Sequence, residues 1–391
     1  MEYPDCYLCL LQETFRFLQY VGLSGIIPNR SCRHAKSKSF HERRIWQFFI
    51  TVFHIIITVH MLTLIILYYG FKINVPHMQF IKKAHGQPGE IFSLTLSACC
   101  CYNASLLTMF NFWKDRKKAT ETISEMWNEN STRSNKEFKK IFLVQKIIYR
   151  VITPSLQIFC IFCMIFLIYR CYHIAIGYLG LYVTGFYIII IFLACTQGLN
   201  LFIGQVTYFF VTTEIIRKKF SRIVHELRDL LNRKYDYEDF KSIQAEHNVI
   251  CKMVIVLDGF FNKYIFLAYC LFLPAICFNT HFLIFSNSLG ELALSMGYSN
   301  CLLVTTVLII TLTCEALTNE SIRPRDVLHE LALFELHSKI RLQLNLFMER
   351  INGFKVGFTC LEYFVVTGNT LSNIISFLAT YLLMYVQFMK D

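Results

Sequence analysis

The sequence predicts an all-α membrane protein with seven transmembrane helices, a cytoplasmic N-terminus and an extracellular C-terminus. Two observations carry this prediction: the composition of the chain and the distribution of its positive charge. Of the 391 residues, 55% are hydrophobic and only 17% are charged, and the mean hydropathy is +0.44. Charged residues normally make up about a quarter of a soluble globular chain. The composition therefore excludes an ordinary soluble fold and indicates a protein surrounded by lipid.

Seven apolar stretches are long enough to cross a bilayer, because about 20 helical residues span the hydrocarbon core. We expect the spans at residues 46–70, 90–113, 147–169, 178–211, 260–288, 299–318 and 355–388. The fourth and fifth stretches are long enough to tilt or to protrude from the membrane.

Positive charge predicts the orientation, since Lys and Arg close to the spans stay on the cytoplasmic side. With the N-terminus inside, 33 of the 38 Lys and Arg residues fall on the inner segments. G-protein-coupled receptors have the opposite orientation, so this class is disfavoured. The net charge of +11 is accounted for by the inner loops, and no basic stripe predicts a nucleic-acid partner.

The inner segments have the apolar periodicity of packed helices rather than of disordered loops. One stripe follows the fourth span and contains Phe220, Ile223, Val224, Leu227, Leu230 and Leu231. A second helix is expected to begin near Pro324, because proline is tolerated in a first helical turn, and to carry Val327, Leu328, Leu331 and Phe334. We therefore predict a single domain over 1–391, made of a six-helix bundle over 1–318, a cytoplasmic anchor helix over 319–354 and a last span over 355–388.

The last span carries a line of polar and Met side chains on one helix face. Its members follow each other at steps of 4, 3, 4, 4 and 3 residues: Asn369, Asn373, Ser376, Thr380, Met384 and Gln387. Such a line is typical of a seam between helices, where polar side chains bond to each other in place of water. It is also typical of the wall of a water-filled pore. A single helix cannot enclose a pore, so the second interpretation requires a ring of identical subunits.

The sequence lacks the motifs expected of an enzyme or of a secondary transporter. No phosphate-binding loop, nucleophile motif or cluster of metal ligands stands out, so we predict no enzyme, no cofactor and no metal. His54 and His60 in the first span lie about 120° apart around a helix and cannot share one face as haem or metal ligands. Most of the 16 cysteines lie in apolar runs and are expected to be inert. A secondary transporter would predict internal repeats, and none is found.

The end of the chain resembles the insect gustatory receptor family. Residues 380–388 read Thr-Tyr-Leu-Leu-Met-Tyr-Val-Gln-Phe, which matches the TYhhhhhQF signature of that family, where h is hydrophobic. The segment Gly357-Phe358-Thr359-Cys360 and the segment Asn369-Thr370-Leu371 are similar to the family's approach to its last span. The N-terminal segment 17–24 is a weaker match. Insect odorant receptors share the architecture but usually lack this ending, and remain the alternative.

The resemblance implies a ligand-gated, poorly selective cation channel in the plasma membrane of gustatory neurons. It implies a homotetramer, or a hetero-oligomer with related receptors, in which the last spans surround a central pore. The family's Gln and Phe at the outer constriction correspond to Gln387 and Phe388, and Thr380 and Tyr381 would support the wall. The inner helices would form the anchor between subunits.

The resemblance also implies a tastant cavity in the outer half of the first six spans. Such pockets are mainly aromatic with a few placed polar groups, although Tyr is also enriched at membrane interfaces for reasons unrelated to ligands. The candidates are Tyr169, Tyr172, His173, Tyr178, Tyr182, Tyr187, Asn279, Thr280, His281, Ser286, Tyr298 and Asn300. Because charged side chains are nearly absent from this set, we expect a bitter or deterrent plant compound rather than a sugar.

Overall fold

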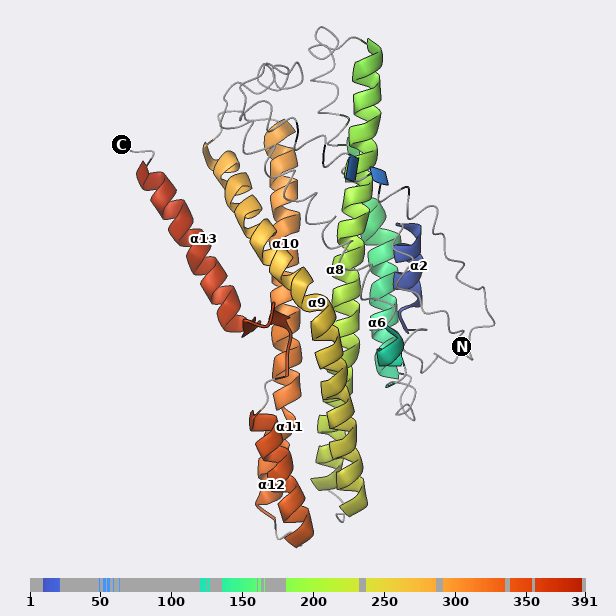
Figure 1. The fold of residues 1–391 in the computed structure, drawn as a ribbon, viewed down its shortest axis with the longest axis vertical. Coiled ribbons are helices and arrows are strands. Elements are labelled where there is room, and N and C mark those ends of the chain that lie inside the picture. Colours follow the sequence, from blue (N-terminus) through green and yellow to red (C-terminus); the bar gives the residue numbers. More distant parts are fainter. Residues whose placement is uncertain are drawn as a thin grey trace.

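The fold is a bundle of long helices (Figure 1). The structure is a computed structural model, and it describes residues 10–21, 120–124, 126, 136–159, 161, 162, 165, 181–231, 237–285, 291–334, 338–353 and 356–388, with isolated positions between 49 and 63. The shorter helices are α2 (Gln12–Tyr20), α6 (Lys136–Ile147), which runs into a π-helical turn (Ile148–Ile152), α11 (Pro324–Ala332) and α12 (Ser338–Gly353). The longer ones are α8 (Leu181–Leu231), α9 (Tyr237–Phe285), α10 (Glu291–Ile322) and α13 (Gly368–Phe388).

Three of the described helices are long and apolar enough to cross a membrane, over Thr196–Leu230, Tyr237–Ile284 and Met296–Ala332. Helix α8 has 51 residues and α9 has 49. At 1.5 Å per residue each is about 75 Å long, far more than the ~30 Å of the hydrocarbon core. Both helices therefore continue well beyond a membrane, as the length of the fourth and fifth apolar stretches predicts. The spans predicted at 46–70 and 90–113 lie almost wholly outside the described residues.

Helices α8, α9 and α10 run side by side, and α11 and α12 lie at one end of them (Figure 1). Both stretches with predicted helical periodicity are helical: α8 continues without a break through the apolar stripe after the fourth predicted span, and α11 begins at Pro324. Five members of the first stripe are buried, namely Phe220, Ile223, Val224, Leu227 and Leu230. In the second stripe Val327, Leu328 and Leu331 are buried, whereas Phe334 is 49% exposed.

Two predicted boundaries are wrong. The segment 319–354 is not one anchor helix, because α10 extends to Ile322 and is followed by the separate helices α11 and α12. The last helix begins at Gly368 rather than at residue 355. The residues before it form a small antiparallel hairpin, in which β1 (Thr359–Cys360) pairs with β2 (Phe364–Val365). Their apolar sequence is like that of a transmembrane helix, but their backbones form the hydrogen bonds of an antiparallel strand pair.

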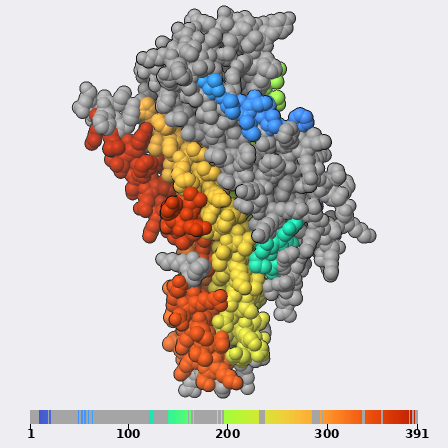
Figure 2. All heavy atoms as spheres, viewed as in Figure 1, coloured from blue at the N-terminus to red at the C-terminus, as the bar shows by residue number. Residues whose placement is uncertain are grey.

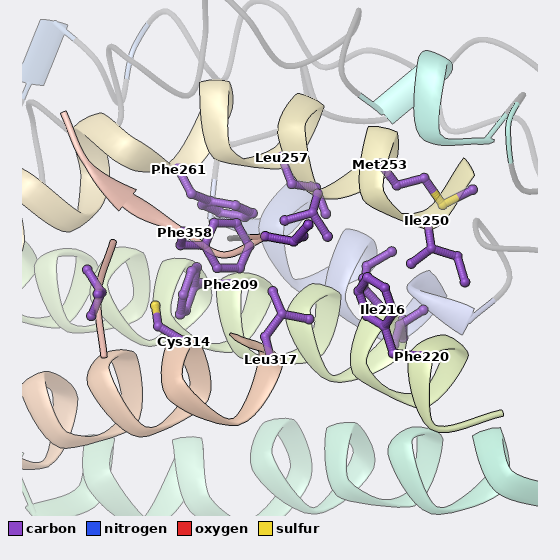
Figure 3. Close-up of a cluster of buried hydrophobic side chains, with 14 of the residues drawn as sticks. Phe209, Ile216, Phe220, Ile250, Met253, Leu257, Phe261, Cys314, Leu317 and Phe358 are labelled. Atoms are coloured by element: carbon purple, nitrogen blue, oxygen red, sulfur yellow. The ribbon is translucent and has the colours of Figure 1, made fainter. Parts of the chain in front are cut away.

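Two residues just before the hairpin, Gly357 and Phe358, pack closely against the bundle. The Phe358 ring is fully buried, with its centre 5.3 Å from that of Phe209 on α8 and 5.9 Å from that of Phe261 on α9. The three rings are part of the buried apolar cluster in Figure 3. Next to Phe358, a Cβ on Gly357 would lie 2.5 Å from Thr318 Oγ1 on α10 and 2.8 Å from Val365 Cγ1. Glycine is therefore needed at position 357 for the segment before the hairpin to pack against α10.

We expect Gly357→Ala to destabilise the fold, because both atoms in its way belong to packed elements. The cost of such overpacking is about 1–3 kcal/mol, measured as a lower melting temperature of the purified protein in detergent. Gly353→Ala is the matched control, since a Cβ on Gly353 meets nothing within 4 Å. Equal melting temperatures for the two variants would contradict the close packing at Gly357.

Candidate functional site

The predicted polar line lies on the outward face of α13. Its six members are all exposed: Asn369, Asn373, Ser376, Thr380, Met384 and Gln387. The opposite face holds Ile374, which is buried, and Leu378, which packs against the core. At about 100° per residue these two positions lie roughly half a turn away from the polar line. The line therefore does not serve as a seam with α9 and α10, the described helices that α13 contacts.

Helix α13 diverges from the bundle along its length, as Figure 1 shows, and it forms an outer edge of the molecule in Figure 2. Apolar side chains flank the polar line and are exposed as well, including Phe377 and Leu383. Tyr381 is half-buried, and Phe388 ends the helix. The large exposed apolar surface and the exposed polar line together indicate that the face is covered by lipid or by further protein.

The start of α13 is fixed more tightly than its end. The Thr367 N–H donates to Thr370 Oγ1 at 3.1 Å, and the Thr370 N–H donates to the Thr367 carbonyl at 2.9 Å. This reciprocal pair satisfies backbone donors of the first helical turn. A Cβ on Gly368 would collide with the Glu315 carboxylate of α10. The first turn is therefore held at a defined place on α10, whereas the outer turns diverge from the bundle.

Some of the expected ligand-binding residues are brought together between α9 and α10. The Asn300 amide donates to Thr280 Oγ1 at 3.0 Å, and Asn279 is buried one residue before Thr280. The Tyr298 hydroxyl donates to the Leu156 carbonyl at 3.3 Å, and its ring lies 4.7 Å from that of Phe159. His281 is half-buried on α9. The structure thus joins Thr280 of the fifth predicted span to Asn300 of the sixth, whereas Tyr298 contacts the segment that holds Leu156 and Phe159.

The remaining candidates are not placed by the structure. Tyr182 and Tyr187 lie on α8, but their side chains are outside the described part, as are Tyr169, Tyr172, His173, Tyr178 and Ser286. One polar pair was not predicted from the sequence: the Gln157 amide donates to Asn200 Oδ1, and Asn200 on α8 is only 3% exposed. An amide inside an apolar run is the signal that points to such a pair.

The ends of the long helices next to α11 and α12 enclose charged groups, in the segment predicted to be cytoplasmic. Arg222 pairs with Glu226 at 2.8 Å. Lys219 is only 6% exposed, and burial lowers its pKa to about 8 against the opposing attraction of Glu246. Burial, reinforced by the charge of Glu226, raises the pKa of Glu246. The end of the bundle that carries α11 and α12 is therefore a packed unit with charges inside it.

His247 is part of this packing. Its ring lies 5.5 Å from that of Phe220 and 5.0 Å from that of Phe347, both edge to face. Burial lowers the pKa of His247 to about 4, so the imidazole is neutral at pH 7. His247 therefore joins α8, α9 and α12 as a neutral aromatic side chain.

The potential metal ligands and the thiols of the described part of the chain are dispersed. No group of three or more His, Cys, Asp or Glu side chains there could hold a metal ion. Six cysteines whose side chains the structure describes are free thiols: Cys251, Cys270, Cys277, Cys301, Cys314 and Cys360. Burial raises the pKa of Cys251 on the inner part of α9 to about 12, which keeps it protonated and unreactive.

The sequence matches a family of seven-span receptors. A model of the 7tm Chemosensory receptor family matches residues 12–390, which is nearly the whole chain. The chain belongs to this family. The resemblance found at the C-terminal motif is thereby confirmed at the level of an insect chemoreceptor, and the family is one of receptors rather than enzymes. No match to a curated protein was found.

Solved structures support the same fold. The chain is similar to the insect olfactory receptor OR5 from Machilis hrabei in complex with eugenol, with a TM-score of 0.72 and 12% identity over 97% of this chain and 99% of that chain. It is also similar to the structure of the same receptor described without eugenol, with a TM-score of 0.70 and 10% identity over 95% and 98% of the two chains. At such low identity the likeness establishes the all-α chemoreceptor fold.

We expect acid to destabilise the inner part of the bundle through His247. Its pKa in the folded state, about 4, is below its ordinary value of 6.5. The unfolded chain therefore binds the proton more readily between these values, and stability falls as the pH drops from 7 to 5. The loss from this one group is about 1–2 kcal/mol. In His247→Phe the stability difference between pH 7 and pH 5, measured by thermal unfolding in detergent, should be smaller by that amount.

His225→Ala is the control for this experiment, since His225 is exposed on the neighbouring helix α8. Its stability should change with pH as in the unmodified protein. If His247→Phe also kept the full pH dependence, His247 would not be the group that resists protonation.

Proposed function

We propose that the chain is a gustatory receptor subunit, part of a tastant-gated, poorly selective cation channel in the plasma membrane of sensory neurons. The observation that carries this proposal is the exposed polar line of α13, which lies opposite the helix face that packs on α9 and α10. Four such helices around an axis would line a pore with amide and hydroxyl groups. The C-terminal motif, which ends in Gln387 and Phe388, supports assignment to the gustatory branch.

The distribution of charge supports a cytoplasmic N-terminus and an extracellular C-terminus. Among the described residues, Lys and Arg are absent from 181–216 of α8, from 264–285 of α9 and from all of α10 and α13. They lie on α2, on α6 and its π-helical turn, on the parts of α8 and α9 near α11 and α12, and on α11 and α12 themselves. The last four elements share one end of the bundle (Figure 1). This is the asymmetry by which membrane proteins are oriented. On this assignment the outer end of α13, with Gln387 and Phe388, faces the outside.

We propose that Phe388 forms the gate and Gln387 the hydrophilic lining next to it. A ring of four phenyl groups excludes water and blocks ions by dewetting. Rotation of α13 would replace the phenyl groups by the Gln387 amides and admit hydrated cations. The remaining members of the polar line, from Asn369 to Met384, would form the wall below, with Thr380 and Tyr381 at its middle.

The ligand would be a small, mainly apolar compound bound between the outer parts of α8, α9 and α10. The Asn300–Thr280 pair and the Tyr298 ring supply the placed polar and aromatic groups that such pockets use. The binding of eugenol by the olfactory receptor OR5 supports a ligand of this class. It also supports a second candidate function, an odour-gated channel, because both similar structures are olfactory receptors.

The test of the proposal is expression in oocytes with a panel of sucrose, caffeine, denatonium, tyramine and eugenol. We expect caffeine or denatonium to evoke a cation current that persists when G-protein signalling is blocked with GDPβS. A current evoked by eugenol alone would favour the odorant candidate, and a response to sucrose alone would favour a sugar receptor. A response abolished by GDPβS would overturn the channel.

We expect Phe388→Ser to raise the current in the absence of any compound, because a hydroxymethyl group wets a constriction that a phenyl ring keeps dry. The matched control is Ile375→Ser on the same helix, where an exposed apolar side chain lies away from the polar line. Currents are compared after normalisation to receptor at the cell surface. If Phe388→Ser receptors stayed silent without ligand, the gate assignment would be wrong.

A further inference from the structure

One carboxylate ties the hairpin before α13 to the middle of α9. Asp258 Oδ1 accepts the backbone N–H of Thr359 at 2.6 Å, and Asp258 Oδ2 accepts the Thr359 hydroxyl at 2.8 Å. Thr359 Oγ1 in turn accepts the N–H of Glu362 at 3.2 Å. Two bonds from one carboxylate to one residue fix orientation as well as distance, and bonds to a charged acceptor are stronger than neutral ones. The hairpin therefore has a defined place on α9.

The turn of the hairpin has a backbone conformation that needs such support. Leu361 and Glu362 have φ values of 47° and 64°, a left-handed region that side chains other than glycine rarely adopt. The Tyr363 N–H donates to the Cys360 carbonyl at 3.1 Å and closes the turn. Strained turns persist only where the surrounding structure holds them, and they are concentrated at switch regions. Asp258 supports the turn indirectly. It accepts a hydrogen bond from the Thr359 hydroxyl, whose oxygen in turn accepts one from the Glu362 N–H.

The hairpin is also the place where α13 is attached to the bundle. The Ser321 hydroxyl of α10 donates to the Val356 carbonyl at 3.2 Å, and the Phe358 ring is buried between α8 and α9. After Gly368 the pore helix diverges from the bundle (Figure 1). A movement of α9 or α10 at the level of the hairpin would therefore move the base of α13.

The same two helices carry the ligand-binding candidates at their outer ends. Asp258 and Asn279 are 21 residues apart on α9, with Pro274 between them, or about 30 Å along the helix axis. Thr311 and Asn300 lie on α10, and the Thr311 hydroxyl is 2.9 Å from that of Tyr269 on α9. Coupling between distant sites is carried by packed side chains and hydrogen bonds between helices. Helix α9 and its bond to α10 provide such a connection from the outer candidates to the Asp258–Thr359 contact.

We propose that Asp258 is a positioning residue that couples α9 to the pore helix by holding Thr359 of the hairpin. This inference rests on the proposed function, in that the coupled event is the opening of a channel by α13. Asp258 acts through its contact with Thr359 of the hairpin. It transmits movement of α9 to the base of α13, and without it the hairpin no longer follows α9.

Currents test the coupling. Asp258→Ala should reduce the current evoked by the most active panel compound about tenfold per receptor at the surface, within the usual range of coupling between two sites. Asp258→Asn should stay within about threefold of the unmodified channel, because its amide oxygen still accepts the Thr359 N–H. Thr359→Val should reduce the current as well, and the double variant should lose no more than Asp258→Ala alone.

Hydrogen exchange tests the contact without any ligand. In the purified, full-length protein in detergent, Asp258→Ala should speed amide exchange over residues 358–366 at least about tenfold, since the protecting acceptor is lost. Asp239→Ala is the matched control in both experiments, because Asp239 is an exposed carboxylate at the start of the same helix. It should leave exchange and current unchanged.

The outcomes separate the two proposals. Unchanged exchange in Asp258→Ala would overturn the contact as a support of the hairpin, whatever the currents show. Faster exchange with an undiminished evoked current would overturn the coupling. If the unmodified protein gave no current with any panel compound, the proposed function would fail and the coupling with it, while the exchange result would still decide whether Asp258 holds the hairpin.

Discussion

The structure depends on one constraint: lipid offers no hydrogen-bond partner to the backbone, so the chain must satisfy its own. Helices meet this condition locally, and nearly all of the described residues are helical. The segment 356–367 breaks the helical pattern and obtains its bonds from elsewhere. Asp258 accepts from the Thr359 N–H, Ser321 donates to the Val356 carbonyl and Thr370 accepts from the Thr367 N–H. Non-helical backbone is present where other elements provide its partners.

Much of this fold could be predicted from residue patterns. The helix start at Pro324 follows from the missing proline N–H, and the orientation of the polar line follows from its spacing, since helical geometry fixes which residues share a face. The Lys- and Arg-rich segments after the fourth span, before the fifth and after the sixth are predicted to lie on one side, and α8, α9, α11 and α12 meet at one end of the bundle. These properties are local, and neighbouring residues are enough to specify them.

The hairpin could not be predicted in the same way. Val356, Phe358, Val365 and Val366 read as part of a span, and the residue that bonds the hairpin to α9 is 101 positions earlier in the chain. Leu361 and Glu362 give no turn signal, because glycine or asparagine normally occupies such positions. The Asn300–Thr280 and Gln157–Asn200 pairs likewise join different helices. Sequence patterns named Asn300 and Thr280 as candidates, but their pairing is a property of tertiary packing.

The segment Gly357-Phe358-Thr359-Cys360, which resembles a family pattern, has a structural role at each of its four positions. Gly357 permits contact with α10, Phe358 fills the space between α8 and α9, Thr359 receives Asp258 and Cys360 is buried at the turn. Each helix that carries a described ligand-binding candidate thus meets the same four residues just before α13. Helix α13 is held at its first turn and diverges from the bundle beyond it (Figure 1), so the position of the first turn determines the position of the whole helix. The short segment is therefore the structural link between the outer bundle and the polar line of α13.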